Sequence, residues 1–190
     1  MVLRNLRSWM MSSRRPRDRF LTLRGTADPS AAMLRIVASA SDRPAFDIGC
    51  IAYGPDRSVL DSVWSRQRKA LRGALLRADE SDRQSVVVHV GAVPPDVATL
   101  VVTVNAPGGG SAFARPMPVT VELISSAGPE VLCRFDLPVA AERTGVLAAR
   151  LDRTTAEWTM TRLGVFQDGK TVRAMVGPAR ILLTAPEGDP

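Results

Sequence analysis

Short apolar segments separated by turn residues are the feature of this sequence that most constrains its fold. The clearest pair is Phe46–Tyr53 and Ser58–Trp64, joined by Gly54-Pro55-Asp56, where proline fixes φ and glycine tolerates a positive value. We predict further strands at Arg19–Leu23, Met33–Ser39, Ser85–Val90, Thr99–Asn105, Met117–Ser125, Val131–Leu137, Gly145–Leu151, Glu157–Leu163, Thr171–Met175 and Ala179–Leu183. This pattern is typical of an all-β fold, an antiparallel β-sandwich of two sheets.

One internal stretch departs from the β pattern. Residues 65–83 contain many charges, good helix formers and few β-branched residues, which predicts a short helix or a loop. A chain of 190 residues is long enough for one domain with a proper core and too short for two. We therefore place a single domain at residues 19–184 and a C-terminal tail at residues 185–190.

The positive charge is concentrated at the N-terminus. Residues 1–24 contain seven arginines and one acid, so the remaining residues are formally neutral. Residues 1–18 form either a disordered basic tail or a short amphipathic helix that contacts an anionic membrane surface or a partner. Translation starting at Met10 or Met11 is a further alternative.

Several features indicate a cytoplasmic protein, with membrane association through residues 1–18 as the alternative. The N-terminus lacks a continuous apolar region and a small-residue cleavage site, and no apolar run reaches about eighteen residues. Cys50 and Cys133 both lie in apolar, strand-like segments. They are interpreted as two buried thiols of a cytosolic protein, with a disulfide between facing strands as the alternative.

The residues that enzymes and nucleic-acid-binding proteins use are sparse. His89 is the single histidine, and no G-x-S-x-G nucleophile elbow occurs. The run Gly108–Gly110 is not followed by Lys-Ser/Thr, so it is not a phosphate-binding loop. Arginines gather in the N-terminal segment instead of spreading over the rest of the chain. We predict a non-enzymatic protein without specific nucleic-acid binding.

Carboxylates are the remaining candidates for a ligand site. A hard cation such as calcium takes about six to eight oxygen ligands. Two carboxylates two residues apart in a strand would share one face, but the residue two positions after Asp47 is Gly49. An acidic cluster, Asp79, Glu80 and Asp82, precedes another predicted strand. This cluster is either part of a cation site or a solvated loop.

Several segments together resemble one bacterial family. They are Phe46-Asp47-Ile48-Gly49-Cys50, Val63-Trp64-Ser65-Arg66-Gln67, Val88–Val97 (VHVGAVPPDV), Arg134-Phe135-Asp136-Leu137 and Glu157-Trp158-Thr159. In this order and spacing they resemble the TerD family of tellurium-resistance and general-stress proteins. The resemblance spans roughly residues 19–184. It implies a two-sheet β-sandwich that binds calcium at one end, has no catalytic activity, and acts with other tellurium-resistance or stress-response proteins.

The departures from the family pattern concern the calcium ligands. The second aspartate of the family's strand corresponds to Gly49, and its long acidic, glycine-rich loop corresponds to the shorter Arg72–Gln84. Within that loop only Glu80 and Asp82 fall on acidic family positions, and two arginines lie close to them. We expect Asp47, Glu80 and Asp82 to be remnants of a calcium site whose affinity is weak or lost.

Two functions remain open from the sequence. The first is a TerD-like protein of a tellurium-resistance or general stress-response system, with a degenerate calcium site and action through protein partners. The second is a peripheral scaffold that binds anionic membrane or nucleic acid through the arginine-rich segment 1–18.

Overall fold

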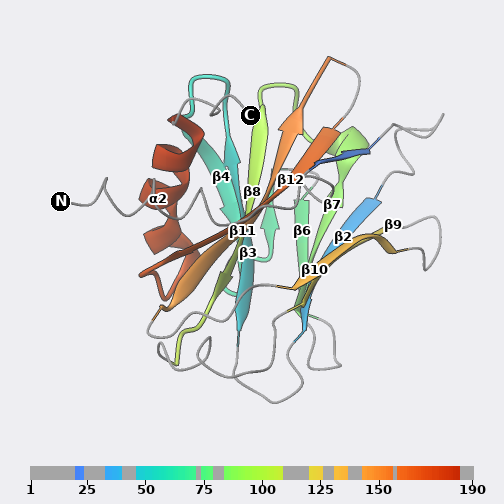
Figure 1. Cartoon of the computed structure of the whole chain (residues 1–190). Coiled ribbons are helices and arrows are strands. Elements are labelled where there is room, and N and C mark those ends of the chain that lie inside the picture. Colours follow the sequence, from blue (N-terminus) through green and yellow to red (C-terminus); the bar gives the residue numbers. More distant parts are fainter. Residues whose placement is uncertain are drawn as a thin grey trace.

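Two antiparallel sheets and one α-helix account for most of the chain that the structure describes (Figure 1). The structure is a computed structural model, and it describes residues 20–23, 33–39, 46–71, 74–78, 84–108, 120–125, 131–136, 143–155 and 158–184. The predicted N-terminal segment 1–18 and the tail 185–190 lie outside these ranges. Among the described residues, no helix has both the length and the apolar composition needed to span a membrane.

Each sheet has six strands in the described part of the chain. The first sheet runs in the order β1 (Phe20–Leu23), β12 (Trp158–Gln167), β11 (Gly145–Arg153), β8 (Thr99–Asn105), β3 (Asp47–Tyr53) and β4 (Val59–Val63). The second runs in the order β10 (Val131–Asp136), β9 (Thr120–Ser125), β2 (Met33–Ser39), β7 (Gln84–His89), β6 (Ala74–Ala78) and β5 (Lys69–Ala70). A 3-10 turn at Val90–Ala92 follows β7. The predicted antiparallel, mostly β architecture is confirmed.

Alternation along β3 divides the buried residues into two layers. Ile48, Cys50 and Ala52 belong to a core that also contains Val86 and Val121 of the second sheet. Ile51 and Tyr53 belong to a separate cluster, shared with the helix α2 (Val172–Thr184). Because successive side chains of a strand point to opposite faces, β3 contributes to both clusters. The first sheet is therefore covered by the second sheet on one face and by α2 on the other (Figure 1).

The predicted hairpin from β3 to β4 forms, but the positive φ expected at Gly54 lies at Arg57 instead. The amide of Arg57 donates to the Gly54 carbonyl at 2.9 Å, and the amide of Gly54 donates to the Ser58 carbonyl at 2.9 Å. The carboxylate of Asp56 accepts from both the amide and the hydroxyl of Ser58. Arg57 takes the positive φ of 65° that closes the turn.

The prediction of two strands at the C-terminal end was wrong. Thr171–Met175 and Ala179–Leu183 contribute instead to the single helix α2. Val172, Met175 and Ala179 recur at three- and four-residue spacing and are buried, which is the pattern of one helical face. Gly177-Pro178 resembles a turn in the sequence, yet packing of that face on the sheet carries the helix through the proline.

The prediction of a helix or loop over residues 65–83 was wrong at β5 and β6, whereas the turn at Ser65-Arg66 agrees with the loop alternative. After a tight turn that bridges Trp64 and Gln67, the chain forms β5 and then β6. β6 pairs antiparallel with β7 from Ala74↔Val88 to Ala78↔Gln84. Backbone pairing in the sheet thus overrides the helical propensity of its alanine, leucine and arginine residues.

Candidate functional site

Asp47 lies at the start of β3 and is nearly buried, with 7% of its surface exposed. Its Oδ2 accepts a hydrogen bond from the Ser65 hydroxyl at 2.9 Å. Its Oδ1 is buried and has no hydrogen-bond partner among the described residues. Burial raises the pKa of this carboxyl, and the bonds from Ser65 and the charge of Arg66 oppose that rise. Asp47 thus has one buried oxygen whose hydrogen-bonding capacity no described residue uses.

The next residue on the same face is Gly49, and it has no space for a side chain. A Cβ at this position would overlap Cγ2 of Val172 and lie 2.9 Å from the Val63 carbonyl oxygen. It would also lie 3.3 Å from Oγ1 of Thr103. The start of α2 therefore occupies the place where a second carboxylate of the strand would project.

Polar residues on this face of β8 hold the segment before α2. Asn105, opposite Asp47 in the strand register, is fully buried. Its Nδ2 donates to the Gly169 carbonyl at 2.6 Å, and its Oδ1 accepts from the Thr103 hydroxyl at 3.1 Å. The side-chain amide of Asn105 is thus engaged in seating the chain that leads into the helix.

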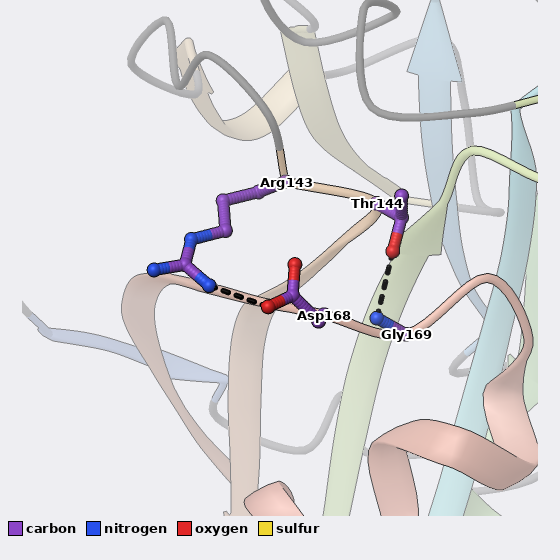
Figure 2. A network of polar contacts seen from close by, with 4 residues as sticks. All are labelled: Arg143, Thr144, Asp168 and Gly169. Carbon is purple, nitrogen blue, oxygen red and sulfur yellow. Dashed lines mark hydrogen bonds and ion pairs between the residues drawn. The ribbon is translucent and has the colours of Figure 1, made fainter. Parts of the chain in front are cut away.

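A second set of contacts fixes the same segment from the β11 side (Figure 2). The amide of Gly169 donates to Oγ1 of Thr144 at 2.8 Å, and the Arg143 guanidinium pairs with the Asp168 carboxylate at 2.6 Å. Figure 2 shows both interactions side by side, between the residues that precede β11 and those that precede α2. Residues 168 and 169 are therefore held by Asn105 of β8 and by the two residues that precede β11, which positions the helix over Gly49.

The structure brings only part of the predicted calcium site into view. Asp47 is described, whereas Glu80 and Asp82 lie outside the described residues. Across the ranges that are described, no three His, Cys, Asp or Glu side chains gather as a metal-binding group. Calcium requires several oxygen ligands. The described residues fit it poorly, because they offer one unpartnered carboxylate oxygen and exclude a second carboxylate at Gly49.

The two cysteines and the single histidine were the other residues singled out in the sequence. Cys50 is a free, buried thiol, as predicted, and burial raises its pKa to about 12. The side chain of Cys133 lies outside the described part. His89 ends β7 and is partly buried.

The sequence of this chain matches the model of the TerD domain over residues 51–176. This chain belongs to the TerD family. It is 26% identical over 136 residues to the tellurium resistance protein TerZ of Serratia marcescens, which covers 68% of this chain and 69% of that relative. The predicted family membership is confirmed.

Two solved structures share the fold of this TerD-family chain. One is a homologue of the telluride resistance protein TerD from Streptomyces coelicolor, with a TM-score of 0.58 and 16% identity over 77% of this chain and 95% of that one. The other is a protein described as of unknown function, with a TM-score of 0.58 and 14% identity over 75% of this chain and 92% of that one. At these identities the likeness concerns the fold alone.

Sequence reasoning missed the contacts of two arginines with one tryptophan ring in the TerD-family domain. The guanidinium carbons of Arg66 and Arg173 lie 6.0 and 5.8 Å from the centre of the Trp64 ring. Trp64 and Arg66 were noted only as part of a family motif. Arg173 is far from them in sequence, and its segment was predicted as a strand. Recognising the 3.6-residue period of Val172, Met175 and Ala179 would have placed Arg173 on the outer face of a helix.

Proposed function

We propose that this chain is a non-enzymatic protein of a bacterial tellurium-resistance or general stress-response system that acts through protein partners. The observation that carries the proposal is the TerD-domain match over residues 51–176, together with the similarity to TerZ. The non-enzymatic part rests on the sequence, which has a single histidine and no nucleophile elbow.

A growth assay tests the proposed role in the cell. The gene for this chain is deleted from its host, and growth is measured in tellurite and in oxidative stress, with and without a plasmid copy. We expect the deletion to increase sensitivity and the plasmid copy to restore growth. Growth of the deletion strain equal to that of the parent under all these stresses would contradict the proposed function.

We further propose that the calcium site is degenerate, with weak or lost affinity. Support comes from Gly49, which replaces a carboxylate of the family pattern and lies against Val172. A cation bound only to the folded state stabilises it by RT ln(1 + [L]/Kd), which is about 1.4 kcal/mol at ten times Kd. We expect thermal unfolding in millimolar calcium and in chelator to coincide closely. A large calcium-dependent rise in Tm that is lost in Asp47→Asn would contradict this proposal.

The alternative function is a peripheral scaffold that uses segment 1–18. The charge distribution favours it, because five of the seven N-terminal arginines fall within these residues. Deleting residues 1–18 tests the alternative by sedimentation with anionic vesicles and by binding to duplex DNA at low salt. Loss of binding would support the scaffold role, and unchanged binding would exclude this segment as its basis.

A further inference from the structure

The outward face of α2 has positive charge and no acidic residue. Arg173, Gly177 and Arg180 are exposed and follow one another at four- and three-residue spacing, so they form one stripe along the helix. A Cβ at Gly177 would meet nothing within 4 Å, so the space between the two arginines is open. α2 has no Asp or Glu at any position from Val172 to Thr184. The helix therefore has two exposed arginines with no side chain between them at Gly177.

The turn after β4 adds a third arginine beside this stripe. Arg66 and Arg173 both lie within 6.0 Å of the Trp64 ring centre, although they come from different elements. Cation–π contact holds each guanidinium near the ring without neutralising its charge. We call the surface formed by Trp64, Arg66, Arg173, Gly177 and Arg180 the α2 basic surface.

Some arginines elsewhere in the described part form ion pairs with nearby acids, namely Arg134 with Glu122, Arg143 with Asp168 and Arg150 with Asp152. Arg153 donates to backbone carbonyls instead. Within the same described ranges, Arg66, Arg173 and Arg180 form no ion pair with a carboxylate. Like charges gathered on one surface repel one another, and an anionic partner relieves that repulsion.

We propose that the α2 basic surface docks an extended acidic segment of a partner protein. Arg173 and Arg180 are seven residues apart, which is about 10.5 Å along a helix axis. An extended segment in the polyproline II conformation advances about 3.1 Å per residue with three residues per turn, so carboxylates three residues apart lie on one face about 9.3 Å apart. Each guanidinium can bind a carboxylate with two parallel hydrogen bonds, which gives such a segment a defined register.

An acidic protein segment suits this surface better than a membrane does. A helix that binds at a bilayer surface inserts its apolar face among the lipids. The apolar face of α2, with Val172, Met175 and Ala179, is buried against the first sheet. Within the described part of the helix, Ile181 is the large apolar residue that is exposed, with 57% of its surface accessible. The surface therefore offers charge and hydrogen-bond donors but little apolar area to insert.

This inference rests on the proposed action through protein partners and supplies a surface for one of them. It is tested with the full-length protein by fluorescence anisotropy at low ionic strength. The probe is a labelled Gly/Ser peptide with glutamates at every third position, and the same peptide with glutamines is the ligand control. The variant Arg173→Gln/Arg180→Gln is compared with Arg134→Gln/Arg162→Gln, which removes the same charge from other exposed positions. Both retain the arginine-rich N-terminus, so its contribution cancels.

We expect the α2 double variant to bind the glutamate peptide about five- to tenfold more weakly, because two exposed carboxylate–arginine contacts are lost. The control double variant should bind within about twofold of the parent protein. If the α2 double variant melts at a lower temperature, Arg66→Gln supplies a third substitution in the turn, and its binding should fall in the same direction. The glutamine peptide should not bind.

Equal losses in the two double variants would overturn the proposal, because they would show a general effect of net charge. Vesicles containing anionic phospholipid form a second arm. Binding of vesicles that depends on Arg173 and Arg180, without binding of the peptide, would assign the surface to a membrane and also overturn the proposal. The tellurite growth assay is independent of this measurement. If the peptide does not bind but the deletion strain is sensitive to tellurite, the docking surface alone is rejected. If the peptide binds but the deletion strain grows like its parent, the proposed function is rejected.

Discussion

Gly49 of β3 lies directly against Val172, the first residue of α2, and leaves no space for a Cβ between the strand and the helix. The contact places the helix start over the bare backbone of the strand. It also closes the position that corresponds to the second acidic residue in the family pattern. The glycine at position 49 therefore has two consequences: it lets the helix pack against β3, and it leaves no carboxylate at this position.

Substituting Gly49 should destabilise the fold, and more so as the new side chain becomes larger and charged. We expect Gly49→Ala to lower the free energy of unfolding by about 1–3 kcal/mol, because the Cβ overlaps Val172 and the Val63 carbonyl. Gly49→Asp should cost more, since it also buries a charge. Urea unfolding measures both changes.

Gly108→Ala is the matched control for that series, because a Cβ at Gly108 would meet nothing within 4 Å. Its free energy of unfolding should change by less than about 0.5 kcal/mol. Equal stability of the Gly49→Ala and Gly108→Ala proteins would show that α2 does not press on β3. A calcium-dependent gain of stability in Gly49→Asp would show that the helix yields to a restored site.

Tyr53 should titrate far above the usual range of a tyrosine. Burial raises its pKa from 10.0 to about 12, the nearby Cys50 adds to the rise, and Arg180 opposes it. Tyr53 is the single tyrosine of the chain, so phenolate absorbance in the ultraviolet reports it alone. We expect a midpoint near 12 in the folded protein and near 10 in denaturant. A folded-state midpoint at 10 would contradict the burial of this hydroxyl.

The same shift predicts how stability depends on alkaline pH. Because the folded-state pKa of Tyr53 is raised, the folded protein holds the phenolic proton more tightly than the unfolded chain does. Its stabilising contribution is complete below pH 10 and is lost as the pH rises towards 12. Tyr53→Phe should flatten the stability curve over this window, and also remove the bond to the Val176 carbonyl at 3.0 Å. Arg180→Gln should move the midpoint further upward.

Arg153, the last residue of β11, should contribute strongly to the free energy of unfolding. Its guanidinium donates to the carbonyls of Val97, Val93 and Pro94, each at 2.9 Å, and lies 4.7 Å from the Trp158 ring centre. We expect Arg153→Met to lower the free energy of unfolding by about 2–3 kcal/mol, since hydrogen bonds to a charged group are lost. Chemical denaturation measures the change.

Arg153→Lys should recover only part of that loss, because a single ammonium cannot reproduce the planar fork that reaches three carbonyls. The exposed Arg134, whose Nη1 lies 3.5 Å from the Glu122 carboxylate, is the comparison. Arg134→Met should cost less than about 1 kcal/mol. A similar cost at both positions would mean that the network around Arg153 adds nothing to stability.

The sequence predicts elements whose signals are local and misses those decided by packing. The hairpin around Gly54 forms where predicted, because Gly54-Pro55-Asp56 is a local turn signal, although the positive φ of the turn lies at Arg57 and not at the glycine. β6 was missed, because its alanines and leucines favour a helix and only pairing with β7 makes it a strand. α2 was missed because Gly177-Pro178 interrupts its pattern, while burial against the first sheet sustains the helix.

The same distinction applies to the candidate site. Asp47 could be singled out from its residue type and family position, and the absence of a second carboxylate was visible at Gly49 in the sequence. That Val172 fills this space could not be predicted, because the contact joins residues far apart in the chain. The α2 basic surface depends on the same helix, so its arginines could not be grouped before α2 was placed on the first sheet.

The buried hydrogen bond from Asn105 to the Gly169 carbonyl should stabilise α2 more than the exposed ion pair between Arg143 and Asp168 does. Asn105→Ala leaves the Gly169 carbonyl without its 2.6 Å donor in a buried place, which should cost about 1–3 kcal/mol. Amides of α2 should then exchange with deuterium faster, while those of β8 and β3 change less. Arg143→Gln removes the pair with Asp168, whose two side chains are 48% and 67% exposed, and should cost less than about 1 kcal/mol. Faster exchange of α2 in Arg143→Gln than in Asn105→Ala would reverse this order and show that the surface pair, not the buried amide, holds the helix.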